Sequence, residues 1–358
     1  MEVSEQKEWL DRWYRYMKNQ QLDNAKTRKE KIEAHLDEFT DPDLRKLYKL
    51  LMIRYHVMFL DLESAAKMIT ETGPDEENKY HWLNYYYFFF RGFYHLECRE
   101  YKTAVTYFTR AKLFISDIEV EETAELYYKL AVAYFRTFQI SRSIKYSNKA
   151  LIIYEEKSYF KRIADCENTL GMNNLFIGQY KEALNHYNNA LKSVEKTNDK
   201  ILKMIILHNL GNLYTELNKP INALNYLNQA IKGLPLNSKC QTFYLITKNY
   251  FKVNQSELAL KYLQRGLELA DQHQYFDYKY HFSLLRAKYL DQELYDSVSK
   301  KAIDYFKANE SWDYVIEYSE DLATHLRSIG NHKEAMNYFH LAVITKNQIK
   351  RERVITSA

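Results

Sequence analysis

Apolar residues in the first sixty positions recur every three or four residues, which predicts three amphipathic helices. The first stripe runs through Trp9, Trp13 and Met17. The second and third stripes contain Leu22, Ala25, Ile32, Leu36 and Phe39, followed by Leu44, Leu47, Leu51 and Met58. We therefore expect these first sixty positions to form a three-helix bundle.

The remainder of the chain repeats a longer pattern of small and large residues. A glycine is followed by alanine after twelve residues, by a large apolar residue after sixteen and by alanine after nineteen. This register fits Gly92/Ala104/Phe108/Ala111, Gly171/Ala183/Tyr187/Ala190 and Gly211/Ala223/Leu227/Ala230. Looser versions begin at Ala131, Thr247 and Ala323. The successive spacings are 39, 40, 40, 36 and 76 residues, and the last leaves room for one degenerate repeat.

Small residues at the first two places allow two helices to approach closely, and the large residue is expected to fill the gap between neighbouring repeats. The pattern is similar to the tetratricopeptide repeat, a stacked pair of helices. We expect an all-α protein in which the bundle precedes a right-handed superhelix of about seven helix pairs with a concave binding surface. The predicted domains are residues 1–62, a linker over residues 63–80, and a repeat domain over residues 81–358.

Composition removes several classes of function. The chain has 8 glycines and 4 prolines, too few for a turn-rich all-β protein. Its net charge of +4 is too small to indicate nucleic-acid binding, and no apolar run approaches the length of a membrane span. Three scattered cysteines predict neither disulfides nor a zinc site. Without catalytic or phosphate-binding motifs, we expect no cofactor and no metal. The opening string MEVSEQKEWL is polar and charged, unlike a signal peptide, and we therefore expect a cytoplasmic location.

One asparagine interrupts an otherwise regular helix in the string HNLGNLY. Asn212 follows the small residue of its repeat, a place that faces the concave groove in tetratricopeptide helices. A side-chain amide there can donate to a carbonyl and accept from an N–H of an extended peptide. A solvated surface amide is the alternative. The same argument places seven further residues in the candidate groove: Asn168, Met172, Leu175, Phe176, His208, Thr215 and Glu216.

A short bundle followed by a long repeat domain resembles the Rap proteins of spore-forming Gram-positive bacteria. The strings RWYRYMK, LYKLLMIRYHVMFLD, YYYFFFRGFYHL, RIADCENTLGMNN and HNLGNLYTELNKPINAL carry the resemblance, which covers nearly the whole chain. It implies a cytosolic regulator that acts on response regulators, either as an aspartyl-phosphate phosphatase or by occupying a DNA-binding domain. It also implies release of the target by a short re-imported signalling peptide, with Asn212 anchoring the peptide backbone.

Two departures from the family pattern are visible. Phosphatase members have a glutamine at the start of the third helix, and its place here falls on Pro42, within the string TDPDL. Proline offers no side-chain donor or acceptor for water, and the flanking Asp41 and Asp43 would repel a phosphoryl group. As an N-cap followed by a first-turn proline, Asp41 and Pro42 are explained by helix initiation alone. This departure argues against phosphatase activity.

The second departure lies in the groove. Many family members have an acidic pair in the stretch matched by GMNNLFIG, where this chain has Leu175 and Phe176. Burying an arginine of the peptide against these side chains would leave its charge unpaired. We therefore expect the peptide of this protein to be apolar at that position.

These observations predict a non-enzymatic antagonist of a response regulator or another transcription regulator. The target is expected to dock on residues 1–62 and the peptide to bind around Asn212. Two alternatives remain: an active phosphatase that positions water with another residue, and a plain tetratricopeptide scaffold without a signalling peptide.

Overall fold

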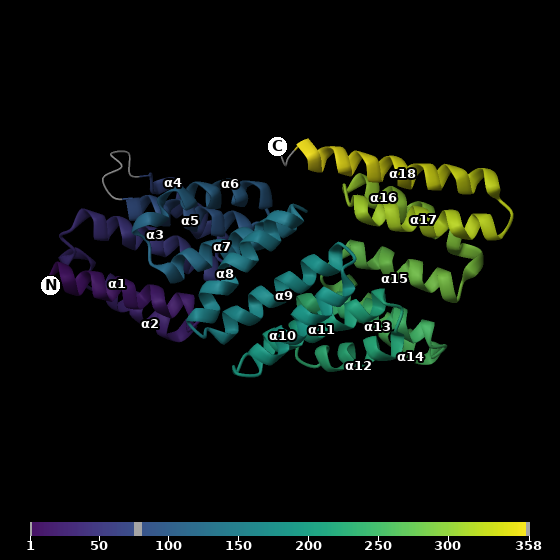
Figure 1. The fold of residues 1–358 in the computed structure, drawn as a ribbon, viewed down its shortest axis with the longest axis horizontal. Helices are drawn as coiled ribbons and strands as arrows, with labels where there is room; N and C mark the ends of the chain where they lie inside the picture. The colour runs from purple at the N-terminus through teal and green to yellow at the C-terminus, as the bar shows by residue number, and fades with distance from the viewer. Residues whose placement is uncertain (1, 75–80, 356–358) are drawn as a thin grey trace. The chain divides into compact units, whose positions relative to one another are not determined.

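The computed structural model describes residues 2–74 and 81–355, and within these ranges it contains helices and no strand. By its internal contacts the chain divides into two compact units, Met1–Asn173 and Asn174–Ala358. Figure 1 labels the helices of both units in chain order. Among the described residues, no helix combines the length and the apolar composition that crossing a membrane would require.

The first unit holds the predicted bundle and the first repeats. Its helices are α1 (Val3–Lys18), α2 (Leu22–Glu33), α3 (Pro42–Met58), α4 (Leu62–Glu71), α5 (His81–Glu97), α6 (Tyr101–Ala111), α7 (Val120–Arg136), α8 (Ile140–Glu156) and most of α9 (Phe160–Phe176). Two short 3₁₀ segments, η1 (Leu36–Glu38) and η2 (Lys112–Asp117), follow α2 and α6. The buried apolar side chains of α1–α6 and most of those of α7 belong to one hydrophobic core, whereas most of those of α8 pack with α9 in a second core.

The start of α3 is confirmed in atomic detail. Asp41 precedes the helix, and its Oδ1 accepts hydrogen bonds from the backbone N–H groups of Asp43 at 2.8 Å and Leu44 at 3.2 Å. Pro42 occupies the first turn, where its missing N–H costs nothing. At the opposite side of the bundle, the indole Nε1 of Trp13 donates to the carbonyl of Ala25 at 2.9 Å and joins α1 to α2.

A helix occupies the first part of the predicted linker. The side chain of Asp61 accepts a hydrogen bond from Ser64 N at 3.1 Å and caps α4, which packs on α3 and buries Ala65 and Ile69. Residues 75–80 of the predicted linker lie outside the described residues. The proposed domain boundary at residues 63–80 stays a prediction.

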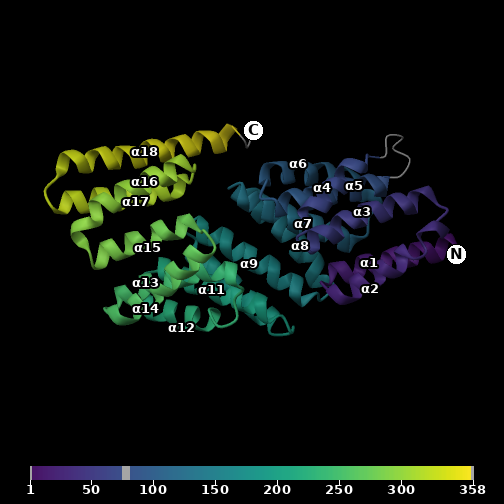
Figure 2. The ribbon, with the colours of Figure 1, turned by 180° about the vertical axis from the view of Figure 1, so that it is seen from behind.

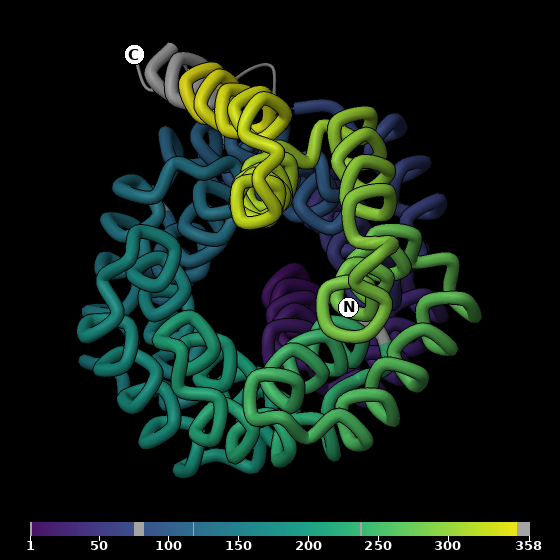
Figure 3. Tube along the Cα trace, turned by 90° about the vertical axis from the view of Figure 1, so that its right-hand side faces the viewer, coloured from purple at the N-terminus to yellow at the C-terminus, as the bar shows by residue number. Residues whose placement is uncertain are grey.

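The second unit continues the repeat. It contains α10 (Tyr180–Val194), α11 (Lys200–Glu216), α12 (Pro220–Ala230), α13 (Leu236–Lys252), α14 (Ser256–Gln272), α15 (Phe276–Tyr289), η3 (Gln292–Leu294), α16 (Tyr295–Ala308), α17 (Trp312–Ser328) and α18 (His332–Ile355). Seen from behind, α11 lies beside α12 and α13 beside α14 (Figure 2). The trace in Figure 3 follows these hairpins in order, from teal through green to yellow. The degenerate repeat predicted between Thr247 and Ala323 is the pair α15–α16.

The small residues of the register are close-approach points. A Cβ added to Gly92 would lie 2.5 Å from Phe108 Cδ1, and one added to Gly211 would lie 2.5 Å from Leu227 Cγ. The large residue therefore fills the space above the glycine of its own pair, where we had expected it between neighbouring repeats. In the looser repeat, Ser143 is fully buried and its hydroxyl donates to the carbonyl of Ala131 at 2.8 Å.

The turn between paired helices recurs with the same period from the first helix onward. The left-handed residues at these turns are Gln20, Leu60, Arg99, Phe138, Gly178, Asn218, Asn254 and Gly330. The first two extend the 39–40-residue period into the bundle, because Trp13 and Ile53 precede Ala25 and Ala65 by the usual twelve residues. The sequence register missed this segment because large side chains stand there in place of glycine or alanine.

Candidate functional site

Asn212 is the fifth residue from the C-terminal end of α11 and directly follows Gly211, which contacts α12 closely. Gly211 is buried against α12, whereas Asn212 is half-buried. Among the residues that the structure describes, the amide of Asn212 has no hydrogen-bond partner. Its donors and its acceptor are therefore available for a ligand that approaches this face of α11.

Thr215, also predicted in the groove, is buried and already hydrogen-bonded. Its hydroxyl donates to the carbonyl of Gly211 at 2.9 Å and accepts from Asn249 Nδ2 at 2.7 Å. Asn249 Nδ2 also donates to the carbonyl of Leu245 at 2.8 Å, so this pair joins α11 to α13. Contact of Thr215 with a ligand stays a prediction, and its present role is to hold neighbouring repeats together.

His208 lies one turn before Asn212 and is also buried. The hydroxyl of Thr242 donates to the carbonyl of Ser238, and it therefore accepts from His208 Nδ1 at 3.0 Å. Burial lowers the pKa of His208 to about 4, so the imidazole is neutral at pH 7. A neutral, hydrogen-bonded ring fixes the spacing of α11 and α13 beneath the face that carries Asn212.

Charged residues continue this face on the next repeat. Glu216 is exposed one turn after Asn212, and Lys248 and Lys252 occupy the equivalent places on α13, 36 residues later. Lys252 Nζ donates to Asn218 Oδ1 at 2.9 Å. Burial lowers the pKa of Lys252, and the nearby charge of Lys248 adds to this effect.

Two carboxylates of α17 form ion pairs with lysines of α13 and α15 within the second unit. Lys248 Nζ lies 3.9 Å from Glu317 Oε1, and Lys288 Nζ on α15 lies 2.6 Å from Asp321 Oδ2. Burial raises the pKa of Glu317, and Lys248 only partly offsets this rise. We define the second-unit face as the side chains of Asn212, Glu216, Lys248, Lys252, Lys288, Glu317 and Asp321. All come from the first helix of a pair.

Sequence reasoning found Asn212 and Glu216 on this face but missed the charged residues on α13, α15 and α17. The available signal was the recurrence of lysine at the two places of Asn212 and Glu216 one repeat later, at Lys248 and Lys252. The carboxylates could not be paired with them from sequence, because Glu317 is 69 positions away from Lys248.

The remaining predicted groove residues belong to α9. Asn168 and Met172 lie in the first unit, where Asn168 Nδ2 is 3.8 Å from Met172 Sδ. Leu175 is half-buried and Phe176 is 40% exposed, both at the start of the second unit. Their contact with a peptide stays a prediction.

The candidate catalytic position provides helix capping. Both backbone N–H groups that Asp41 binds belong to the first turn of α3, so its Oδ1 is occupied. Pro42 has no polar side-chain atom. Within the described part of the chain, no group of three or more His, Cys, Asp or Glu side chains is placed to hold a metal ion.

Comparison with known proteins agrees with this architecture. A tetratricopeptide-repeat family profile matches residues 162–235. The transcriptional activator NprA of Geobacillus stearothermophilus is 24% identical over 94% of this chain and 87% of its own length. The regulatory protein RapF of Bacillus subtilis is 26% identical, covering 93% and 92% of the two chains. Response regulator aspartate phosphatase I of the same organism is 26% identical, covering 97% and 92%.

The chain is similar to the Rap regulators over nearly its whole length. Solved structures share the fold over nearly their whole length. A Rap protein complexed with competence and sporulation factor superposes with a TM-score of 0.82 at 21% identity, covering 97% of this chain and 99% of that one. NprR in complex with its cognate peptide NprX gives a TM-score of 0.71 at 22% identity, covering 97% and 99%. Both the bundle and the repeats of this chain lie within these matches.

Proposed function

We propose that this protein is a cytoplasmic, peptide-regulated antagonist of a response regulator or another transcription regulator. The target binds the module of residues 1–62, and a short imported peptide binds the second-unit face and releases the target. The protein acts by occupancy and does not hydrolyse phosphate.

The amide of Asn212 carries the peptide half of this proposal. It is half-buried on α11, has no hydrogen-bond partner among the described residues, and is followed by a row of charged side chains. An amide can bind both polar groups of one peptide unit whatever the side chain of that residue. The charged row supplies contacts that distinguish one peptide from another. Two similar solved structures hold, by their names, a signalling factor and a cognate peptide.

The non-enzymatic half rests on the start of α3. Pro42 stands where the family resemblance places a catalytic glutamine, and the side chain of Asp41 already caps α3. Response regulator aspartate phosphatase I is nevertheless similar over most of this chain, so phosphatase activity is the competing function.

A phosphate-release assay separates the two. The purified protein is mixed with the phosphorylated response regulators of its host, and loss of phosphoaspartate is followed while complex formation is measured on a sizing column. We expect a stable complex and an unchanged rate of phosphate loss. Catalytic loss of phosphate would overturn the non-enzymatic assignment. Binding to no response regulator and to no other transcription regulator would favour a plain scaffold.

A further inference from the structure

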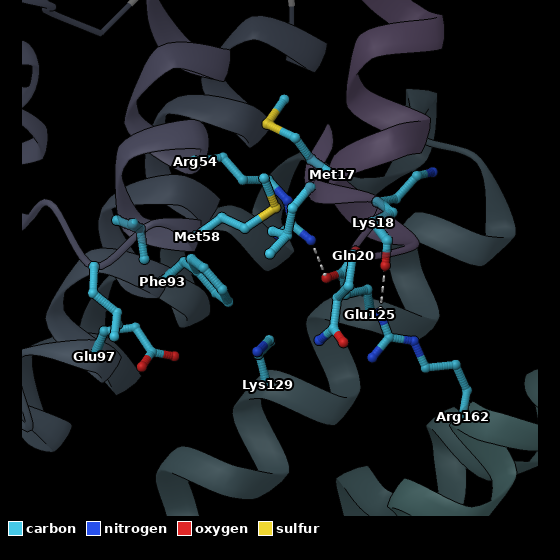
Figure 4. A pocket seen from close by; sticks show the side chains of 13 residues that line it. Met17, Lys18, Gln20, Arg54, Met58, Phe93, Glu97, Glu125, Lys129 and Arg162 are labelled. Atoms are coloured by element: carbon cyan, nitrogen blue, oxygen red, sulfur yellow. Dashed lines mark hydrogen bonds and ion pairs between the residues drawn. The ribbon is translucent and has the colours of Figure 1, made fainter. Parts of the chain in front are cut away.

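A cavity of about 420 Å³ lies in the first unit. Side chains of α1, α2, α3, α5, α7 and α9 line it, and Figure 4 shows Arg54, Glu97, Glu125 and Lys129 around a common space. The lining contains four cations and two carboxylates: Lys18, Arg54, Lys129, Arg162, Glu97 and Glu125. Lys18 is paired with Glu122 and Arg162 with Asp165, both outside the lining, so Arg54 and Lys129 remain opposite Glu97 and Glu125.

Two of these cations lack a full set of partners. Arg54 is 5% exposed; its Nη2 donates to Glu125 Oε1 at 2.9 Å, whereas its Nη1 is buried without a hydrogen-bond partner. Lys129 makes no ion pair with any described residue. Its Nζ lies 4.2 Å from the ring centroid of Phe93, and the Arg54 guanidinium lies 4.9 Å from the same centroid.

Arg162 is better satisfied than these two. Its Nη1 lies 3.4 Å from Asp165 Oδ2, and its Nη2 donates to the carbonyl of Lys18 at 3.2 Å. What remains unmet in the cavity is a hydrogen-bond acceptor for Arg54 Nη1 and an ion-pair partner for Lys129 Nζ. Water can accept a hydrogen bond from a guanidinium, but it cannot neutralise the ammonium group of Lys129, whereas an anion can do both.

We propose that this cavity binds a small organic anion, whose carboxylate or phosphate group contacts Arg54 Nη1 and Lys129 Nζ. The apolar part of the ligand lies against Met17, Met58 and Phe93, which complete the wall beside the cations. The volume is that of a small-molecule site, and a few convergent polar groups on an apolar wall are typical of such sites.

The electrostatics of Lys129 support the same conclusion. Burial lowers its pKa to about 8; Glu125 and Glu97 oppose this effect, and Arg54 and Arg162 reinforce it. An anion in the cavity supplies the missing counter-charge and holds Lys129 protonated. The site therefore binds an anion more tightly when Lys129 carries its proton.

Calorimetric titration of the full-length protein tests the site directly. Phenyl phosphate and benzoate serve as probes at constant ionic strength, and they distinguish a phosphate from a carboxylate site. We expect saturable binding of at least one probe and an affinity about tenfold lower, or weaker still, in Lys129→Met, the factor for one lost contact to a charged group. Lys129→Arg keeps the charge and is expected to keep binding.

Lys149→Met is the matched control. Lys149 also lies in the first unit near an aromatic ring, with Nζ 5.2 Å from the Tyr127 centroid, but it does not line the cavity. Its loss is expected to leave probe binding unchanged. Absence of saturable binding by either probe, or equal affinities of Lys129→Met and the unaltered protein, would overturn the proposal.

The pH dependence of anion binding by the unaltered protein gives a second test, which does not depend on whether a Lys129 variant folds. Benzenesulfonate remains anionic between pH 7 and pH 9.5, so any change in its affinity reports the protein. We expect affinity to fall about tenfold across this range as Lys129 loses its proton, and Lys149→Met to show the same fall. An affinity that does not change with pH would refute the role of Lys129.

Discussion

The buried ion pair between α3 and α7 offers the sharpest energetic test of the first unit. Arg54 Nη2 lies 2.9 Å from Glu125 Oε1, and the two residues are 5% and 3% exposed. Glu125→Gln removes the negative charge while preserving the shape of the side chain. The Arg54 guanidinium is then buried beside three other cations of the cavity lining, with Glu97 as the remaining lining carboxylate.

The size of the loss follows from the pKa of Glu125. Burial alone would raise it, but the positive charges of Arg54, Arg162, Lys129 and Lys18 lower it from 4.5 to about 2. That difference corresponds to about 3 kcal/mol of stability at pH 7. The contribution is present above pH 4.5 and is lost as the pH falls toward 2. Between pH 7 and pH 4, the difference in free energy of unfolding between the unaltered protein and Glu125→Gln is expected to decrease by about 1 kcal/mol.

Urea unfolding followed by tryptophan fluorescence measures this loss, because Trp9, Trp13 and Trp82 all belong to the first unit. The unaltered protein and Glu125→Gln must be compared at each pH, because burial raises the pKa of the nearby Glu122. The raised pKa of Glu122 changes the free energy of unfolding with pH in the direction opposite to that of Glu125. The double variant Arg54→Met with Glu125→Gln removes both charges, and we expect it to be more stable than Glu125→Gln alone. A double variant destabilised by the sum of the two single losses would refute this reasoning.

Four further predictions follow from single side chains. Asn212→Ala should abolish the response to peptide while target binding and the unfolding midpoint stay unchanged; a retained response would exclude the second-unit face. Gly211→Ala should cost about 1–3 kcal/mol in chemical unfolding because its Cβ meets Leu227 at 2.5 Å. Gly73→Ala, with nothing within 4 Å of the added Cβ, should change stability by less than about 0.5 kcal/mol, and equal costs at both glycines would contradict the close-packing argument. The pKa of His208 is about 4 in the folded protein and 6.5 in the unfolded chain. The neutral, buried ring therefore contributes fully to folding stability above pH 6.5, and this contribution is lost as the pH falls. Unfolding free energies of the unaltered protein should fall about 2 kcal/mol more between pH 7 and pH 5 than those of His208→Gln, and parallel curves would show that the ring is not buried neutral.

Local patterns predicted the parts of this fold that local physics decides. The register of Gly92, Gly171 and Gly211 located three of the helix pairs. At Gly92 and Gly211 an added Cβ would collide with the partner helix, so the small residue is required by local packing. Asp41 and Pro42 located the start of α3 for the same reason, since capping involves only neighbouring residues.

Contacts between distant segments could not be predicted in this way. Lys18 pairs with Glu122 and Arg54 with Glu125, 104 and 71 residues apart, and nothing in either segment marks its partner. We did not predict α4, because the polar residues that follow residues 63–71 led us to assign this segment to a linker. The repeating left-handed turns at Gln20 and Leu60 show that the period begins earlier than the small-residue pattern indicates.

The asparagines of the repeats show why one amide is available to a ligand while others are structural. Asn173 and Asn249 each stand two residues after the register position, are fully buried, and donate to Ser143 Oγ and Thr215 Oγ1 of the preceding repeat. Asn212 stands one residue after that position. A single step along a helix turns a side chain by roughly 100°, which moves it from the contact between repeats to the half-buried face. On α11 the structural place is taken by Leu213, which is fully buried. An asparagine at 213 would therefore join repeats, whereas the asparagine at 212 keeps its amide for a partner outside the repeat contacts.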